Sequence, residues 1–175
     1  MVAIKVIRSS AMADPRAQDR FRREVDFATK LKHPNLASIY GHGALSDASS
    51  YVVSEYIEGR TLRDEMKATG KIPVPAAVSI LSGIADGLNA AHQAGIAHRD
   101  IKPGSIILMT NSDEPKLKIV DFSFARVAIG HRFVPGTTRS LQGRGILPLS
   151  VSYVSPEQFR GEEVDLRSRS ERAHV

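Results

Sequence analysis

The sequence predicts an α+β fold in which short strands and helices share one core. Short runs rich in β-branched or aromatic residues, such as 2–7 and 51–53, are typical of strands. Apolar residues at spacings of three and four, along 15–31 and 75–94, indicate amphipathic helices. With 175 residues, of which 42% are hydrophobic and 25% charged, the chain is long enough for one domain with a sizeable core.

An ion pair is expected between the first strand and the first helix. The strand at 2–7 is expected to be buried, although Lys5 interrupts its apolar run. A helix is expected to begin at Asp14 and Pro15, because Asp is a good N-cap and proline fits the first helical position. Glu24 lies inside or beside the apolar stripe of this helix, where a carboxylate is costly unless it is paired. Lys5 is the partner that we expect. The stripe consists of Ala17, Phe21, Val25, Ala28 and Leu31.

Further strands and helices are expected along the rest of the chain. Strands at 36–40 and 51–53 flank a loop at 41–50, and strands at 105–109 and 116–120 form a hairpin through a polar turn at 111–115. A short helix at 61–68 begins at the cap residue Thr61, and a longer helix at 75–94 ends at Gly95. His92 is interpreted as a half-buried helix residue. One face of the longer helix carries Val78, Leu81, Ala85, Leu88 and His92.

The stretch from His98 to Ser105 carries the chemistry of the chain. Asp100 stands between basic residues, and Lys102 follows two positions later. An Asp in this setting can accept the proton of a hydroxyl group, and the Lys can neutralise charge that builds on a transferred phosphate. We therefore expect Asp100 and Lys102 to serve phosphoryl transfer, while His98 is interpreted as structural.

The predicted hairpin brings two oxygen-bearing side chains together. Ser105 begins its first strand, and Asp121 follows its second strand. Two such oxygens near each other are the kind of pair that holds Mg²⁺ on the phosphates of ATP.

Four motifs in a fixed order resemble the signature set of protein kinases. They are Val2-Ala3-Ile4-Lys5, His98-Arg99-Asp100, Asp121-Phe122-Ser123 and Ser155-Pro156-Glu157. Lys102 is similar to the lysine of the serine/threonine branch, so the chain resembles the eukaryotic-like serine/threonine kinases of bacteria. This resemblance implies an incomplete two-lobed kinase-like fold. Residues 1–57 would form a partial small lobe, and residues 58–175 a partial large lobe.

The resemblance also implies a nucleotide site. Lys5, paired with Glu24, would orient the phosphates of ATP, and the backbone of Glu55 and Ile57 would bind adenine. Ser54 would control the back of the adenine pocket. Asp121 and Ser105 would hold Mg²⁺.

If the chain is catalytically active, Asp100 would act as the base and Lys102 would stabilise charge. The γ-phosphoryl group of ATP would then pass to a Ser or Thr hydroxyl of a protein substrate. Within residues 124–152, which match the activation segment, the candidate phosphorylation sites are Thr137, Thr138, Ser140 and Ser150.

Several positions depart from the family pattern. The Gly-rich loop is not found before Lys5, Arg169 stands where the family has an Asp, and Ser105 replaces an Asn that ligates metal. The sequence is therefore expected to represent a kinase domain that lacks both ends. Two alternative interpretations stay open. The chain could be a pseudokinase-like module that binds a nucleotide or a partner kinase, or a gene fragment without function.

Composition argues against other classes of function. The net charge is +5, but the basic residues are scattered without interleaved aromatic residues, so we do not expect a nucleic-acid partner. Disulfides and thiolate metal sites are excluded because the chain contains no cysteine. Since no apolar run approaches about 20 residues and no signal peptide is evident, no membrane span is expected and a cytoplasmic location is predicted.

Overall fold

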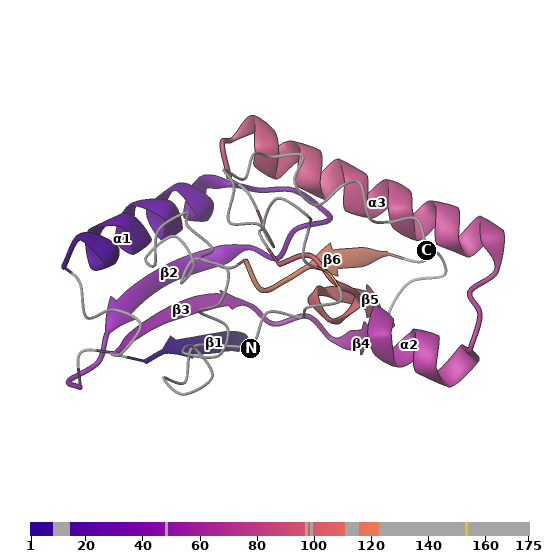
Figure 1. Cartoon of the computed structure of the whole chain (residues 1–175), viewed down its shortest axis with the longest axis horizontal. Coiled ribbons are helices and arrows are strands. Elements are labelled where there is room, and N and C mark those ends of the chain that lie inside the picture. Colours follow the sequence, from indigo (N-terminus) through magenta and orange to yellow (C-terminus); the bar gives the residue numbers. More distant parts are fainter. Residues whose placement is uncertain are drawn as a thin grey trace, which may run out of the picture.

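The computed structural model describes residues 1–8, 15–47, 49–96, 98, 100–110, 116–122 and 153. These residues form two three-stranded sheets with helices packed against them (Figure 1). The strands of the first sheet lie in the order β1-β3-β2, and those of the second in the order β4-β5-β6.

The first sheet is antiparallel and is covered by a helix over one edge. Its strands are β1 (Val2–Ile7), β2 (Ile39–Ala44) and β3 (Ser50–Glu55). Helix α1 (Pro15–Lys30) packs mainly on β2, and its apolar side chains Phe21, Val25 and Ala28 are buried there. β1 pairs with β3 at the opposite edge, with Lys5 facing Val52 in the register.

The prediction that 2–7 is a buried strand is correct for the strand, but only Ile7 at its end is buried in the core. Val2, Ile4 and Val6 share one face of β1 and are 48%, 61% and 54% exposed. β1 is an edge strand, and α1 lies two strands away, over β2. This face of β1 is therefore about half exposed.

The second sheet carries the remaining helices. β4 (Gly59–Thr61), β5 (Ile106–Met109) and β6 (Leu117–Ile119) pair antiparallel. Helix α2 (Leu62–Thr69) follows β4, and the short 3-10 helix η2 (Pro103–Ser105) leads into β5. Helix α3 (Val74–Gln93) crosses β6, as Figure 1 shows.

Two glycines allow α3 to approach β6 closely. A Cβ atom on Gly83 would lie 3.2 Å from Leu117, and one on Gly87 would lie 3.0 Å from Ile119. Because these glycines are one helical turn apart, they form a flat strip on the face that α3 turns toward β6.

The two sheets are joined through residues 35–38. Leu36 forms an isolated parallel bridge with Ile119. The amide of Ala37 donates to the carbonyl oxygen of Ile119 at 2.9 Å. The amide of Ile119 in turn donates to the carbonyl oxygen of Asn35 at 2.8 Å. The side chain of Asn35 donates to Leu117 O at 3.2 Å. One continuous cluster of buried residues therefore runs through both sheets, from Phe21 and Val25 to Leu117 and Ile119.

Most predicted elements are present with shifted ends. The Thr61 cap is confirmed, because its hydroxyl oxygen accepts the amide of Asp64 at 3.1 Å, and Gly95 follows α3 with a φ of +73°. The strand predicted at 36–40 begins at Ile39 instead and continues to Ala44. β4 was not expected. Asp14, the turn 111–115 and the segment 124–152 lie outside the described residues.

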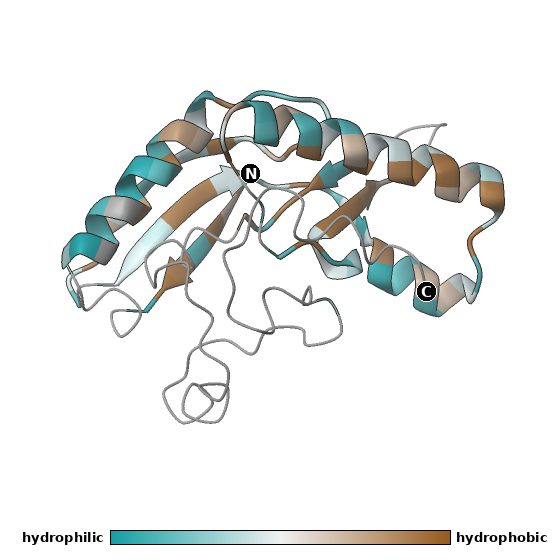
Figure 2. Ribbon diagram, turned by 45° about the horizontal axis from the view of Figure 1, so that its top comes forward, coloured by the Kyte–Doolittle hydropathy of each residue, from teal (hydrophilic) through white to brown (hydrophobic). Residues whose placement is uncertain are grey.

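Helix α3 is also apolar on its outer side. In the described part of the chain it is the one helix long and apolar enough to cross a membrane, by length and composition alone. Figure 2 shows hydrophobic residues along much of its length. On the apolar face that the sequence indicates for this helix, Val78 and Leu81 are 57% and 56% exposed. His92 is half-buried, as predicted, and burial lowers its pKa.

Candidate active site

A cavity of about 320 Å³ lies between the first sheet and the end of β6. Small and apolar side chains of the first sheet line one side, and the other side is closed by residues 120–122. The lining includes Ala3, Lys5, Ile39, Val52, Ser54 and Asp121. The predicted residues Lys5 and Asp121 therefore share one cavity, and Ser54 lies in its wall.

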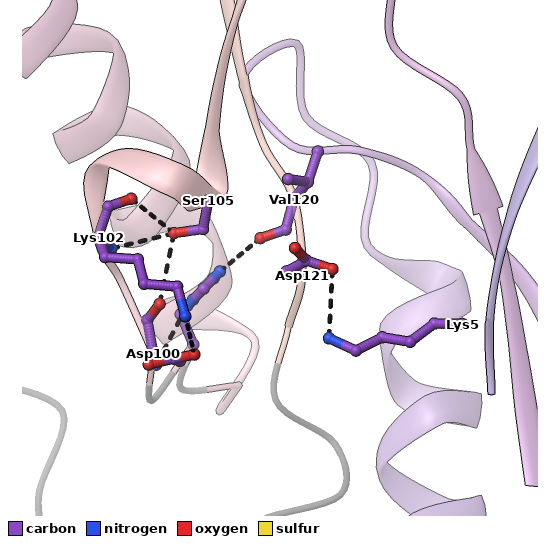
Figure 3. A network of polar contacts seen from close by, with 7 residues as sticks. Lys5, Asp100, Lys102, Ser105, Val120 and Asp121 are labelled. Carbon is purple, nitrogen blue, oxygen red and sulfur yellow. Dashed lines mark hydrogen bonds and ion pairs between the residues drawn. The ribbon is translucent and has the colours of Figure 1, made fainter. Parts of the chain in front are cut away.

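Lys5 and Asp121 form an ion pair across this cavity. Lys5 Nζ lies 3.2 Å from Asp121 Oδ1, and the two side chains are 47% and 53% exposed (Figure 3). Asp121 has a φ of +64° and is the one described non-glycine residue with a positive φ. Such a conformation is costly for a residue other than glycine and is held by surrounding contacts.

The structure gives Asp121 as an ion-pair partner of Lys5, and the pair predicted between Lys5 and Glu24 stays a prediction. Glu24 is half-buried on α1 and makes contacts of its own. Asp121 lies within reach of Lys5 from the opposite wall of the cavity. A role for Glu24 in nucleotide binding stays a prediction.

Asp100 and Lys102 lie together in the loop before η2. Lys102 Nζ donates to Asp100 Oδ2 at 2.7 Å, and the two side chains are 22% and 15% exposed (Figure 3). The ammonium group is thus held beside the carboxylate in a partly buried position. This arrangement fits the predicted pairing of a base with a charge-stabilising cation.

Ser105 holds the same loop from inside. Its hydroxyl donates to the carbonyl oxygen of Lys102 at 2.8 Å and accepts the Lys102 amide at 3.0 Å. The residue is completely buried. The hydroxyl predicted to bind metal is therefore already hydrogen-bonded to the backbone of Lys102. To act as a metal ligand, Ser105 would have to give up these hydrogen bonds.

His98 connects the loop of Asp100 to the strand end of Asp121. The imidazole is 2% exposed. Its Nε2–H donates to Val120 O at 2.8 Å, and its Nδ1 accepts the amide of Asp100 at 3.3 Å. The ring also packs on Phe122, with centroids 4.7 Å apart. The interpretation of His98 as structural agrees with these contacts, because one neutral tautomer satisfies both of them.

The backbone sites predicted to bind adenine lie next to the cavity. The lining reaches Ser54 and does not include Glu55 or Ile57. The amide of Glu55 already donates to Ser38 O at 2.8 Å, so Glu55 would have to contact adenine through its carbonyl oxygen. Ile57 is buried.

The side chain of Glu55 makes contacts that the sequence interpretation did not include. It pairs with Lys118 of β6. Burial raises the pKa of Glu55, but hydrogen bonds from Lys118 and Ser38, together with the Lys118 charge, outweigh it and hold the pKa below the ordinary value of 4.5. The only signal for Lys118 in the sequence is its place between two apolar strand residues, Leu117 and Ile119.

The residues around the cavity fit a nucleotide and a divalent metal. Ala3, Ile39 and Val52 offer an apolar wall for a base, and Lys5 and Asp121 offer a cation and a carboxylate for phosphates and metal. Among the described residues, no group of three or more His, Asp or Glu side chains could hold a metal. Asp121 would therefore hold a metal together with oxygens from the nucleotide.

Comparison with known proteins places the chain in one family. The sequence model of the protein kinase domain matches residues 1–168. The serine/threonine-protein kinase PknB of Mycolicibacterium smegmatis is 37% identical over 170 residues, and that of Mycobacterium leprae is 36% identical over 170. Each alignment covers 95% of this chain but 26% of the relative, so the chain spans about a quarter of the length of these proteins.

Solved kinase structures share the fold. The PknI kinase domain of Mycobacterium tuberculosis superimposes with a TM-score of 0.70 at 26% identity, over 95% of this chain and 58% of that one. Rad53 residues 1–466, in complex with AMP-PNP, gives a TM-score of 0.66 at 28% identity, over 91% of this chain and 35% of that one. The protein kinase family implies ATP and a divalent metal as cofactors and proteins as substrates. The chain belongs to the protein kinase family, and its relatives there are the bacterial serine/threonine kinases.

Proposed function

We propose that this chain binds Mg²⁺-ATP in the cavity beside Lys5 and Asp121 and supports transfer of the γ-phosphoryl group to a Ser or Thr hydroxyl of a protein. The observation that carries the proposal is the contact made by His98. It joins the loop of Asp100 to the backbone next to Asp121, through hydrogen bonds of 3.3 and 2.8 Å. The carboxylates proposed as base and as metal ligand are thereby linked to each other through one buried side chain.

Lys5 and Asp121 would bind the nucleotide in this scheme. Lys5 would neutralise phosphate charge, and Asp121 would hold the metal ion that accompanies the nucleotide. Both groups are about half exposed and paired with each other, so binding must first separate them. The energetic cost of this separation is small, because exposed ion pairs contribute about 0–1 kcal/mol.

Asp100 and Lys102 would act on the acceptor side. Mg²⁺-ATP supplies the phosphoryl group when it is bound. Asp100 would accept the proton of the attacking hydroxyl, and the Lys102 ammonium, 2.7 Å from Asp100 Oδ2, would balance the negative charge that builds on the transferred phosphate.

A nucleotide-binding module without catalytic activity is the second candidate. Its support is the position of Ser105, whose hydroxyl is buried and bonded to the loop backbone. With this oxygen occupied, a second metal ion would have fewer protein ligands. Mg²⁺ demands nearly complete octahedral coordination, so transfer would be impaired while binding persists.

Thermal unfolding with Mg²⁺-ATP tests the binding site. We expect the nucleotide to raise the melting temperature of the wild-type chain, and this rise to disappear in Lys5→Ala and Asp121→Ala. Lys116→Ala is the matched control, because Lys116 is exposed and does not line the cavity. Stabilisation that survives both cavity substitutions would place the nucleotide elsewhere.

A radiolabelled transfer assay separates the two candidates. We expect Asp100→Asn to lower the transfer rate at least about 100-fold, because an amide cannot accept the hydroxyl proton. Asp86→Asn, on the exposed side of α3, serves as the control. A wild-type chain that binds Mg²⁺-ATP but transfers no phosphate would favour the non-catalytic module.

A further inference from the structure

The pair between Glu55 and Lys118 is a partly buried ion pair at the junction of the two sheets. Lys118 Nζ lies 2.7 Å from Glu55 Oε2, and the side chains are 16% and 25% exposed. Glu55 ends β3 of the first sheet, and Lys118 is the middle residue of β6 in the second. The two residues are 63 positions apart in the chain.

The contacts around this pair compensate for its burial. Glu55 Oε2 also accepts the amide of Ser38 at 3.0 Å, and Lys118 Nζ also reaches the carbonyl oxygen of Leu36 at 3.4 Å. Buried charges are stable only when the pairing geometry is good and other hydrogen bonds satisfy the remaining groups. The pair of Arg60 and Glu65 is longer, at 3.8 Å, and its Arg60 side chain is 67% exposed.

The pair connects the two ends of the candidate nucleotide site. Glu55 precedes Ile57 by two residues, and this segment lies where adenine is expected to bind. Lys118 precedes Asp121 by three residues on the strand that leads to the metal-binding carboxylate. A hydrogen-bonded bridge between them therefore fixes the distance from the adenine segment to Asp121.

We propose that Glu55 and Lys118 are positioning residues, which hold the adenine segment at 55–57 and the carboxylate of Asp121 at the spacing that one ATP molecule requires. The inference rests on the proposed nucleotide binding and extends it. A ligand that contacts only one end of the site does not depend on this spacing, whereas ATP contacts both ends at once. Loss of the pair should therefore weaken ATP more than adenosine.

The test compares the affinities of Mg²⁺-ATP and adenosine in competition titrations. We expect the preference for ATP over adenosine to fall about tenfold in Glu55→Gln and in Lys118→Met. The double variant should be no worse than either single variant, because both remove the same interaction. Lys118→Arg should retain the preference, since it keeps the charge and the donor. Arg60→Met, which breaks the longer pair with Glu65, is the matched control and should change nothing.

Each failure has a distinct signature. A wild-type chain that does not bind Mg²⁺-ATP would overturn the proposed function and this inference with it. If the wild type binds but Glu55→Gln and Lys118→Met leave the preference unchanged, the inference alone is wrong. Equal losses for ATP and adenosine would also contradict it, because they would indicate a general loss of structure. Hydrogen exchange at the amides of Glu55 and Ala37 checks that Glu55→Gln remains folded.

Discussion

Gly59 lies in β4 against the backbone of β5. A Cβ atom at this position would overlap the carbonyl oxygen of Leu108. We expect Gly59→Ala to lower the free energy of unfolding by about 1–3 kcal/mol, because a backbone atom cannot move aside as a flexible side chain can. Urea denaturation measures this change.

The control for Gly59 is Gly41→Ala. Gly41 also lies in a strand, but nothing stands within 4 Å of a Cβ built there. If both variants lose the same stability, the loss comes from the change of glycine itself and not from the contact with Leu108.

The lowered pKa of Glu55 predicts a dependence of stability on pH. A carboxyl group whose pKa is lower in the folded chain than in the unfolded chain stabilises the fold above the unfolded pKa. This stabilisation is lost as the pH falls through the folded value. Since the pKa of Glu55 lies below 4.5, the loss should occur below about pH 4.5. Melting temperatures from pH 7 to 3 should fall more steeply for the wild type than for Glu55→Gln.

Single residues could be predicted from sequence where the signal is local. Asp100 and Lys102 are two positions apart, so their proximity follows from the chain itself. The contact of Lys5 with Asp121 depends on how the two sheets lie beside each other, and nothing in residues 2–7 contains this information. The hydroxyl of Ser105 was assigned from its residue type, whereas its burial and its bonds to residue 102 follow from the packing of η2.

At the level of elements, helices were predicted better than strands. Apolar spacing and end residues identify α1, α2 and α3 because both signals lie within the helix. β4 has three residues, Gly59-Arg60-Thr61, which show no alternation and pair with β5 only after folding. The burial of β1 was predicted from its apolar run alone, but a strand at a sheet edge can be apolar and exposed.

The close contact between α3 and β6 depends on Gly87. We expect Gly87→Leu to lower the melting temperature, because the new side chain would meet Ile119 and the side chain of Leu36, each about 3 Å from a Cβ built there. Leucine is the better helix former by nearly 1 kcal/mol, so a net loss would show that packing dominates propensity. Ala85→Leu, on an exposed part of the same helix, should be neutral or stabilising. Equal melting temperatures for the two variants would contradict the packing argument.

For the whole molecule, the exposed stripe on α3 should govern solubility. Val74, Val78 and Leu81 are 75%, 57% and 56% exposed. We expect the 175-residue chain to bind a hydrophobic dye and to aggregate on heating. The double variant Val78→Lys, Leu81→Lys should reduce dye binding without lowering the melting temperature.

Ile80 provides the contrast on the same helix. It is 5% exposed, so Ile80→Ala should cost about 2–5 kcal/mol of stability. Dye binding that persists in the double lysine variant would show that another surface causes it.

The bridge between residues 35–38 and β6 has a consequence for how the chain folds during synthesis. Leu36 and Lys118 are 82 residues apart, and the amides of Ala37 and Ile119 find their partners only across this interval. A nascent chain that has emerged only as far as β3 therefore carries polar backbone groups at 35–38 without their final partners. Contacts between distant segments delay folding, because a long loop must close before they form. The first sheet should thus become stable only after β6 has left the ribosome, and a pause in translation before residue 119 would prolong the exposure of its apolar interior to chaperones.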